Sequence, residues 1–304
     1  MERLNHSETS SKLINYRIIA AGILFAIFWS SAAAATKIGL QSAQPFAVAI
    51  PRFFIAAFIM LFIAHVLLKK RLPAGKEWKQ LAIYGLLNIS IYLGLYVIAM
   101  QFVSAGLGSL SVAINPILIS IMASIWLHHP VKRVALLSLL LCCAGIFIAA
   151  LPLFEKSYAS PGGLCLLLIS TISYSSGAVY FSKQQWNNLH ILTINGWQTL
   201  FGGLFLLPVL LLTYQPNKNH FDFKWAGAIL WLAILVSIFA VQLWLYLLKH
   251  HPVKASFWLF LCPVSGFIIA AIMLHEPVSL YTVIGVLLVI AGLYLVQKKR
   301  TENI

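Results

Sequence analysis

The chain has 304 residues, of which 61% are hydrophobic and 9% charged, with 21 basic and seven acidic side chains. Soluble domains carry about a quarter of their residues as charges, so this composition excludes a soluble globular protein and indicates an integral membrane protein. A basic excess is also typical of nucleic-acid binding, but here Lys and Arg form short clusters between apolar runs rather than one polar face. We therefore expect the lipid bilayer as a partner and no nucleic acid.

Apolar runs close to the ~20 residues that a membrane-spanning helix needs follow one another along the chain. Ten spans are predicted, at residues 17–38, 46–68, 79–100, 105–127, 134–153, 163–182, 190–213, 225–248, 255–275 and 279–297. The first follows the polar stretch "MERLNHSETSSKLINYR" and has no polar region before a cleavage site, so we do not expect a cleaved signal peptide. The predicted fold class is an all-α, polytopic membrane protein.

The distribution of basic residues predicts the orientation. Sixteen Lys and Arg residues fall on the side of the N-terminus, and four fall on the other side: Lys37, Lys156, Lys218 and Lys224. Cytoplasmic segments retain positive charge, so both termini should be cytoplasmic, in a cell membrane of the bacterial inner-membrane type.

A repeat divides the chain into two halves. At an offset of 147 positions the matching landmarks are His128-His129-Pro130 with His275-Glu276-Pro277, Pro116 with Pro263, and Gly145 with Gly292; an offset of 146 aligns Arg52 with Gln198. The halves, residues 17–153 and 163–297, contain five spans each, and an odd number forces the second half to cross the membrane upside down. Secondary transporters often use such inverted repeats and bind substrate between them, near the midplane.

The paired five-helix halves, the Pro in the fourth helix of each, "HEP" after the ninth helix and "VIGVLLVIAGLYLV" in the tenth resemble the EamA domain of the drug/metabolite transporter superfamily. The resemblance covers about residues 18–297, and it implies transport of a small metabolite. Similar family members export amino acids or other metabolites, and some take up nucleotide sugars or cofactors. His129 stands where the family often has Glu.

Polar side chains inside spans are candidates for the substrate site, because hydrocarbon cannot hydrogen-bond them. Asn88, Tyr92 and Tyr96 recur every four residues and share one face of the third span. Their repeat counterparts are apolar, namely Leu235, Phe239 and Leu243. This difference favours a pathway wall on the third span, with helix-to-helix hydrogen bonds as the alternative.

Ser111 and Asn115 precede Pro116, which frees a backbone carbonyl in the fourth span. They have the same two interpretations. Trp29 is either a packing wedge beside small residues or a cavity wall. The remaining candidates for substrate binding, on the basis of their depth in a span, are Gln198, Gln242 and Trp258.

Arg52 lies about 10 Å into the second span, at 1.5 Å per residue. A cation at that depth must be paired or reach water. It either extends to the outer interface or faces a cavity and attracts a carboxylate or phosphate of the substrate, since guanidinium binds such groups through two parallel hydrogen bonds.

Glu276 is interpreted as an anchor at a helix boundary that contacts amides at the start of the tenth helix, with proton coupling as the alternative. The clustered His residues lack partners at metal-ligand spacing, and the four Cys lie in apolar spans, so no metal or cofactor is expected.

The sequence therefore predicts a secondary transporter for a small polar metabolite, such as an amino acid, working by alternating access. The family resemblance favours export. Alternatives are a carrier of nucleotide sugars, cofactors or drug-like compounds, a channel-like subunit, and an intramembrane enzyme, which the absence of a catalytic set within the spans disfavours. A homodimer is left open.

Overall fold

In the computed structural model, the described residues are 2–126, 131, 133–155, 158–250 and 252–301. They form helices and no strand, apart from an isolated bridge between Val103 and Ala159. The first half contains α1 (Glu2–Leu40), α2 (Pro45–Leu61), η1 (Phe62–Leu67), α3 (Lys76–Gly85), η2 (Leu86–Ile91), α4 (Tyr92–Ala99), α5 (Ala105–Val112), α6 (Asn115–Trp126) and α7 (Arg133–Glu155). The second contains α8 (Pro161–Lys183), α9 (Ile191–Thr213), η3 (Pro216–Lys218), α10 (Phe223–Leu230), η4 (Trp231–Ala240), α11 (Val241–His250), α12 (Pro252–Leu274) and α13 (Leu280–Thr301).

Ten membrane spans account for these helices. Among the described residues, eight helical segments are long and apolar enough to cross a membrane, and α12 and α13 contain the shorter apolar stretches Trp258–Leu274 and Leu280–Leu295. The predicted all-α, ten-helix membrane fold is confirmed.

Three spans contain a π-helical segment that the sequence analysis did not predict. The second span ends in η1, the third is interrupted by η2, and the eighth is interrupted by η4. A π-helix has wider turns than an α-helix, so it rotates the faces of the residues that follow, and such segments are frequent at functional sites.

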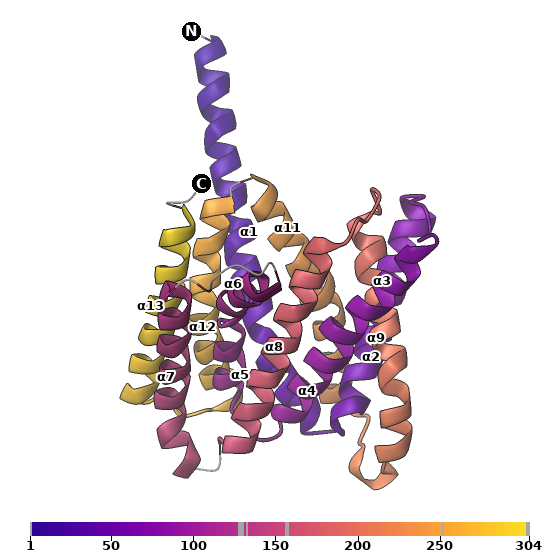
Figure 1. The fold of residues 1–304 in the computed structure, drawn as a ribbon, viewed down its shortest axis with the longest axis vertical. Helices are drawn as coiled ribbons and strands as arrows, with labels where there is room; N and C mark the ends of the chain where they lie inside the picture. Colours follow the sequence, from indigo (N-terminus) through magenta and orange to yellow (C-terminus); the bar gives the residue numbers. More distant parts are fainter. Residues whose placement is uncertain (1, 127–130, 132, 156–157, 251, 302–304) are drawn as a thin grey trace.

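The two halves intertwine in a way that reflects the inverted repeat. The first span, α1, packs against α12 and η4; its repeat equivalent α8 packs against α6 and α4, which belong to the equivalent fourth and third spans (Figure 1). Equivalent spans also pair with each other, as α2 with α9 and α7 with α13. The interface between the halves therefore runs through the whole helical body.

Glycines bring α7 and α13 into close contact. A Cβ atom at Gly145 would lie 2.6 Å from the carbonyl oxygen of Gly285, and one at Gly292 would lie 2.8 Å from that of Ser138. Small residues permit this backbone approach where lipid supplies no hydrophobic drive for helix pairing.

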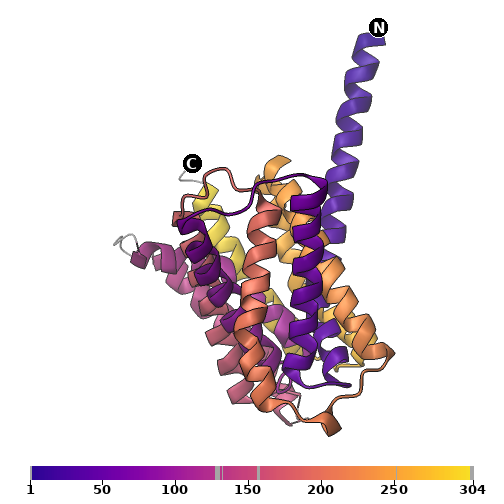
Figure 2. The same ribbon diagram turned by 90° about the vertical axis from the view of Figure 1, so that its right-hand side faces the viewer.

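The start of α1 and the end of α13 lie at the same end of the molecule, called the terminal end below (Figure 1). The N-terminal part of α1 projects beyond the other helices there, as Figure 2 also shows. The loops 41–44 and 214–222 lie at the opposite end.

Candidate functional site

A cavity of about 280 Å³ lies between the two halves. Its walls come from spans one to four and six to eight, and its lining reaches Ile191, the first residue of α9, at the terminal end. Six of the predicted site residues line it: Trp29, Arg52, Asn88, Tyr92, Tyr96 and Gln198. Ligand pockets are typically concave and mostly apolar, with a few converging polar groups, and this cavity has that character.

Arg52 contributes the positive charge of the cavity. Its side chain is 9% exposed, Nη2 donates to Ser237 Oγ at 3.4 Å, and the guanidinium carbon lies 5.4 Å from the ring centre of Phe53. Nε has no hydrogen-bond partner. Of the two positions that the sequence allowed, the structure has Arg52 at the cavity and not at an exposed surface.

Three amides form a chain across the third and seventh spans. Asn88 Nδ2 donates to Gln198 Oε1 at 3.2 Å, and Gln198 Nε2 donates to Asn195 Oδ1 at 3.0 Å. All three residues line the cavity. The chain fixes the direction of each amide and can present an oxygen acceptor at Asn88 and an NH₂ donor at Asn195.

Aromatic rings form much of the remaining wall. Tyr92 lies 4.9 Å from Tyr174 and 6.2 Å from Tyr96 between ring centres. From the first and eighth spans, Trp29 and Trp244 both contact Phe25, with ring centres 5.7 and 5.1 Å from that of Phe25. The cavity thus combines one cation, a few directed amides and hydroxyls, and large apolar surfaces.

The comparison with protein families agrees with this architecture. The model of the EamA-like transporter family matches residues 16–151 and again residues 161–297. The chain belongs to the EamA-like transporter family. It is thereby a member of the drug/metabolite transporter superfamily, as the sequence resemblance indicated.

Relatives of this EamA-like transporter extend over most of its length. An "uncharacterized transporter" of Archaeoglobus fulgidus is 28% identical over 90% of this chain and 96% of its own. Protein PecM of Dickeya dadantii is 28% identical over 80% of this chain and 82% of its own, and the uncharacterized transporter YvbV of Bacillus subtilis is 26% identical over 90% and 89%. A solved structure with 16% identity shares the fold, with a TM-score of 0.63 over 94% of this chain and 99% of the other.

Four predicted site residues of the EamA-like transporter are not among those lining the cavity. Ser111 donates to the Gly108 carbonyl at 2.8 Å, and Asn115 is buried behind the wall, next to the Tyr92 side chain. Gln242 Nε2 is buried without a partner, and the Trp258 ring packs directly on Gly22 of α1. A role for these four in substrate binding stays a prediction.

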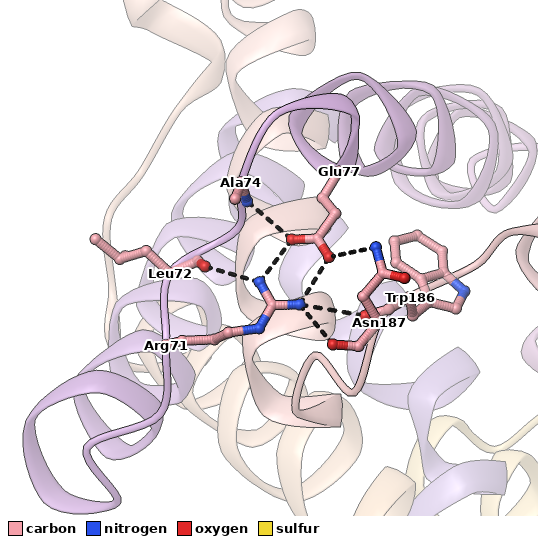
Figure 3. A network of polar contacts seen from close by, with 6 residues as sticks. All are labelled: Arg71, Leu72, Ala74, Glu77, Trp186 and Asn187. Carbon is pink, nitrogen blue, oxygen red and sulfur yellow. Dashed lines mark hydrogen bonds and ion pairs between the residues drawn. The ribbon is translucent and has the colours of Figure 1, made fainter.

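Hydrogen bonds from an ion pair of the first half join loops of the two halves at the terminal end (Figure 3). Arg71 donates to Glu77 through two nitrogens, at 2.7 and 2.8 Å, and to the Asn187 carbonyl at 2.8 Å. Glu77 also accepts the Ala74 amide at 2.8 Å. This cluster holds the loop before α3 against the loop between α8 and α9.

Hydrogen bonds join the corresponding loops at the opposite end. Ser42 donates to Asp222 Oδ2 at 2.9 Å, and the Gln44 amide donates to Asn219 Oδ1 at 2.9 Å. The amide of Trp225 and the hydroxyl of Ser42 hold the pKa of Asp222 below its usual range. At each end, an acidic residue at the start of a span takes part in the contacts between the loops of the two halves. This residue is Glu77 of the third span at the terminal end and Asp222 of the eighth span at the opposite end.

The prediction that Glu276 contacts the tenth helix is wrong. Its side chain, 8% exposed, accepts the amides of Ala105 at 2.6 Å and Gly106 at 3.0 Å, at the start of α5 in the other half. The tenth helix is instead capped locally, because the Thr282 amide donates to Ser279 Oγ at 3.3 Å. A carboxylate is favourable at the N-terminus of α5, so Glu276 anchors one half to the other.

The described histidines include His65, which makes contacts near the end of its span. His65 lies at the terminal end of the second span, where Nε2 accepts from Trp197 Nε1 at 3.1 Å and Nδ1 lies 2.9 Å from the Lys70 carbonyl oxygen. His128, His129 and His251 fall outside the described residues. Among those that are described, no cluster of metal-ligating side chains occurs.

Several cavity residues were missed by the sequence analysis. Tyr84 continues the spacing of Asn88 and Tyr92 by one turn towards the helix start, and Asn195 lies three residues before Gln198. Both spacings could have identified these residues from the sequence. No sequence pattern points to Ser237 and Trp244, because η4 sets which face of the eighth span lies at the cavity.

Proposed function

We propose that this protein is a secondary transporter that moves a small polar metabolite, an amino acid or a related compound, by alternating access. The observation that carries the proposal is the cavity between two inverted repeats, with Arg52 and an amide chain in its wall. Its volume of about 280 Å³ lies near the lower limit for ligand pockets, which supports a small substrate over a nucleotide sugar.

Export is the proposed direction, on the family resemblance. The orientation proposed is with both termini in the cytoplasm of a bacterial-type cell, supported by the sixteen-to-four bias of basic residues. With this orientation, the terminal end is the cytoplasmic end.

The transport proposal is tested with purified protein. A thermal-shift panel of metabolites identifies ligands, since a compound that binds the folded state raises its apparent stability. The best ligand is then followed by counterflow into proteoliposomes and by efflux from intact cells. Absence of counterflow for every stabilising ligand would exclude a carrier of these compounds.

The orientation is tested with single cysteines in a background without the four native ones. A cysteine in place of Lys76 should resist a membrane-impermeant thiol reagent in intact cells, whereas one in place of Lys218 should react. Both positions lie at the ends of helical segments, on opposite sides of the molecule. The reverse labelling pattern would overturn the proposed orientation.

A further inference from the structure

Arg52 carries a charge for which the protein supplies no counter-ion. Arg52 is 9% exposed, its described side-chain hydrogen bond is the 3.4 Å contact with the neutral Ser237 hydroxyl, and its Nε has no hydrogen-bond partner. Within the described part of the chain, the single ion pair is between Arg71 and Glu77, in the loop region at the terminal end. No carboxylate is among the residues described as lining the cavity.

Acidic side chains are also absent from the middle of every predicted span in the sequence. The acidic residues of the whole chain are Glu2, Glu8, Glu77, Glu155, Asp222, Glu276 and Glu302. Each lies near the end of a span or beyond it, in the projecting part of α1, or past the end of α13. Within the described residues, none of these carboxylates contacts Arg52, whose described side-chain hydrogen bond is to Ser237.

The space on the far side of Arg52 is too small to hydrate its guanidinium fully. A small cavity of about 10 Å³ lies there, bordered by Arg52 itself and by residues such as Thr36, Val48 and Leu232. That volume is at the lower limit for a single water molecule, so the space on that side holds at most one water beside the guanidinium. Further hydration of the guanidinium depends on what fills the main cavity.

This arrangement makes closure over an empty cavity costly. When an alternating carrier passes through its occluded state, water leaves the cavity and the cation is left unpaired in surroundings of low dielectric constant. A carboxylate in the cavity removes this penalty, because it pairs with guanidinium through two parallel hydrogen bonds. The barrier to alternation should therefore be lower for the loaded carrier than for the empty one.

We propose that a carboxylate of the substrate is the missing counter-ion of Arg52, and that this transporter alternates when loaded and exchanges one carboxylate compound for another. The inference rests on the proposed function, alternating access. It adds the chemical class of the substrate and the mode of transport, in which export of one carboxylate compound is coupled to uptake of another.

A buried reporter cysteine tests the empty carrier without knowledge of the substrate. Thr36 is 2% exposed, close in size to Cys, and lies beyond Arg52 from the main cavity. Thr36→Cys is introduced into a background lacking Cys142, Cys143, Cys165 and Cys262, and the protein is purified in detergent free of small molecules. The rate of reaction with a bulky thiol reagent then reports opening at the end opposite to the terminal end.

Removing the charge of Arg52 should allow the empty carrier to alternate faster. Adding Arg52→Gln to the reporter protein should raise the labelling rate by about tenfold or more, which corresponds to about 1.4 kcal/mol or more in the barrier. Arg52→Lys keeps a basic group and should label more slowly than Arg52→Gln, and faster than the reporter alone to the extent that a buried ammonium releases its proton. Lys and Gln are similar in size, so the two substitutions alter packing to a similar extent. The thermal unfolding midpoint of each variant shows whether faster labelling comes from a general loss of stability.

A second pair of variants keeps Arg52 and tests the effect of a counter-ion, so it remains informative if Arg52→Gln does not fold. Ser237 Oγ lies 3.4 Å from Arg52, so Ser237→Asp brings a carboxylate to the guanidinium, and Ser237→Asn is the uncharged control of the same shape. Ser237→Asp should label faster than Ser237→Asn by a similar factor.

The outcomes separate the two proposals. Equally fast labelling of the reporter protein, Arg52→Lys, Arg52→Gln and both Ser237 variants would overturn charge-controlled exchange and leave alternating access intact. Equal rates for Ser237→Asp and Ser237→Asn, with Arg52→Gln no faster than Arg52→Lys, would also overturn it. Complete protection of Thr36→Cys in every variant would count against alternating access itself.

Discussion

The third and eighth spans are equivalent in the repeat, yet they contribute differently to the cavity. Asn88, Tyr92 and Tyr96 of the third span line it. Their counterpart Phe239 in the eighth span is 51% exposed, and the residues that line the cavity there include Ser237 and Trp244. The two spans therefore differ in which helix face meets the cavity, as well as in the side chains they carry.

The lengths of the π-helical segments account for this difference. η2 covers 6 residues in the third span, whereas η4 covers 10 residues in the eighth. Because each wide turn rotates the following residues relative to an α-helix, a longer segment changes the face that is presented. An inverted repeat thus preserves the path of the helices while local backbone geometry makes the binding surface asymmetric.

The largest expected effect is at the position where the halves differ in charge. Arg52→Gln copies its repeat counterpart Gln198 and should lower transport of the native substrate by about 10- to 100-fold, since a hydrogen bond to a charged group contributes about 1.5–3 kcal/mol. Arg52→Lys should restore part of the activity, because the charge remains but the two parallel bonds are lost. Counterflow at matched expression measures both, and full activity in Arg52→Gln would remove the basis for substrate-anion binding.

The next effect concerns the faces of the third and eighth spans. Asn88→Ala and Tyr92→Ala should lower transport by about tenfold or change substrate preference at near-normal expression, because each removes a polar group worth about 1 kcal/mol or more from the cavity wall. Leu235→Ala and Phe239→Ala should leave the substrate preference unchanged. If all four act through protein abundance alone, the polar face of the third span serves helix packing.

The contact of Glu276 with the other half gives a smaller effect, on stability. Glu276→Gln leaves one amide at the start of α5 poorly satisfied and should cost about 1–3 kcal/mol of unfolding free energy. The matched control is Glu155→Gln at the exposed end of α7, which should change stability little. Thermal unfolding in detergent decides, and equal midpoints for the two variants would argue against the anchor.

The smallest effect is expected at Asp222, which caps the eighth span as Glu77 begins the third. The pKa of Asp222 is lowered in the folded protein, so its contribution is present above the pKa of an unfolded Asp, about 3.9, and is lost as pH falls through the folded value. Stability of the wild type should therefore decline more steeply below about pH 4 than that of Asp222→Asn. Parallel pH profiles would show that the hydrogen bonds of ionised Asp222 with the Trp225 amide and the Ser42 hydroxyl add no measurable stability.

Much of the architecture follows from the sequence alone. A segment that crosses hydrocarbon must hydrogen-bond its backbone polar groups internally, as a helix does, and it needs about 20 apolar residues to cross. The number of spans and their order can therefore be read from the sequence. The odd count in each half then fixes the inverted repeat. The four-residue spacing of Asn88, Tyr92 and Tyr96 also identified a polar face, because side chains at that spacing share one side of a helix.

Other features were decided by the tertiary structure. Glu276 caps α5, which is 170 positions away in sequence, because packing of the two halves brings the loop after α12 to that helix start. Ser237 meets Arg52 because η4 turns it towards the cavity, and Trp258 packs on Gly22 where α12 crosses α1. Sequence periodicity defines the faces of single helices, whereas the rotation and pairing of helices, which select the faces that meet, depend on contacts between distant segments.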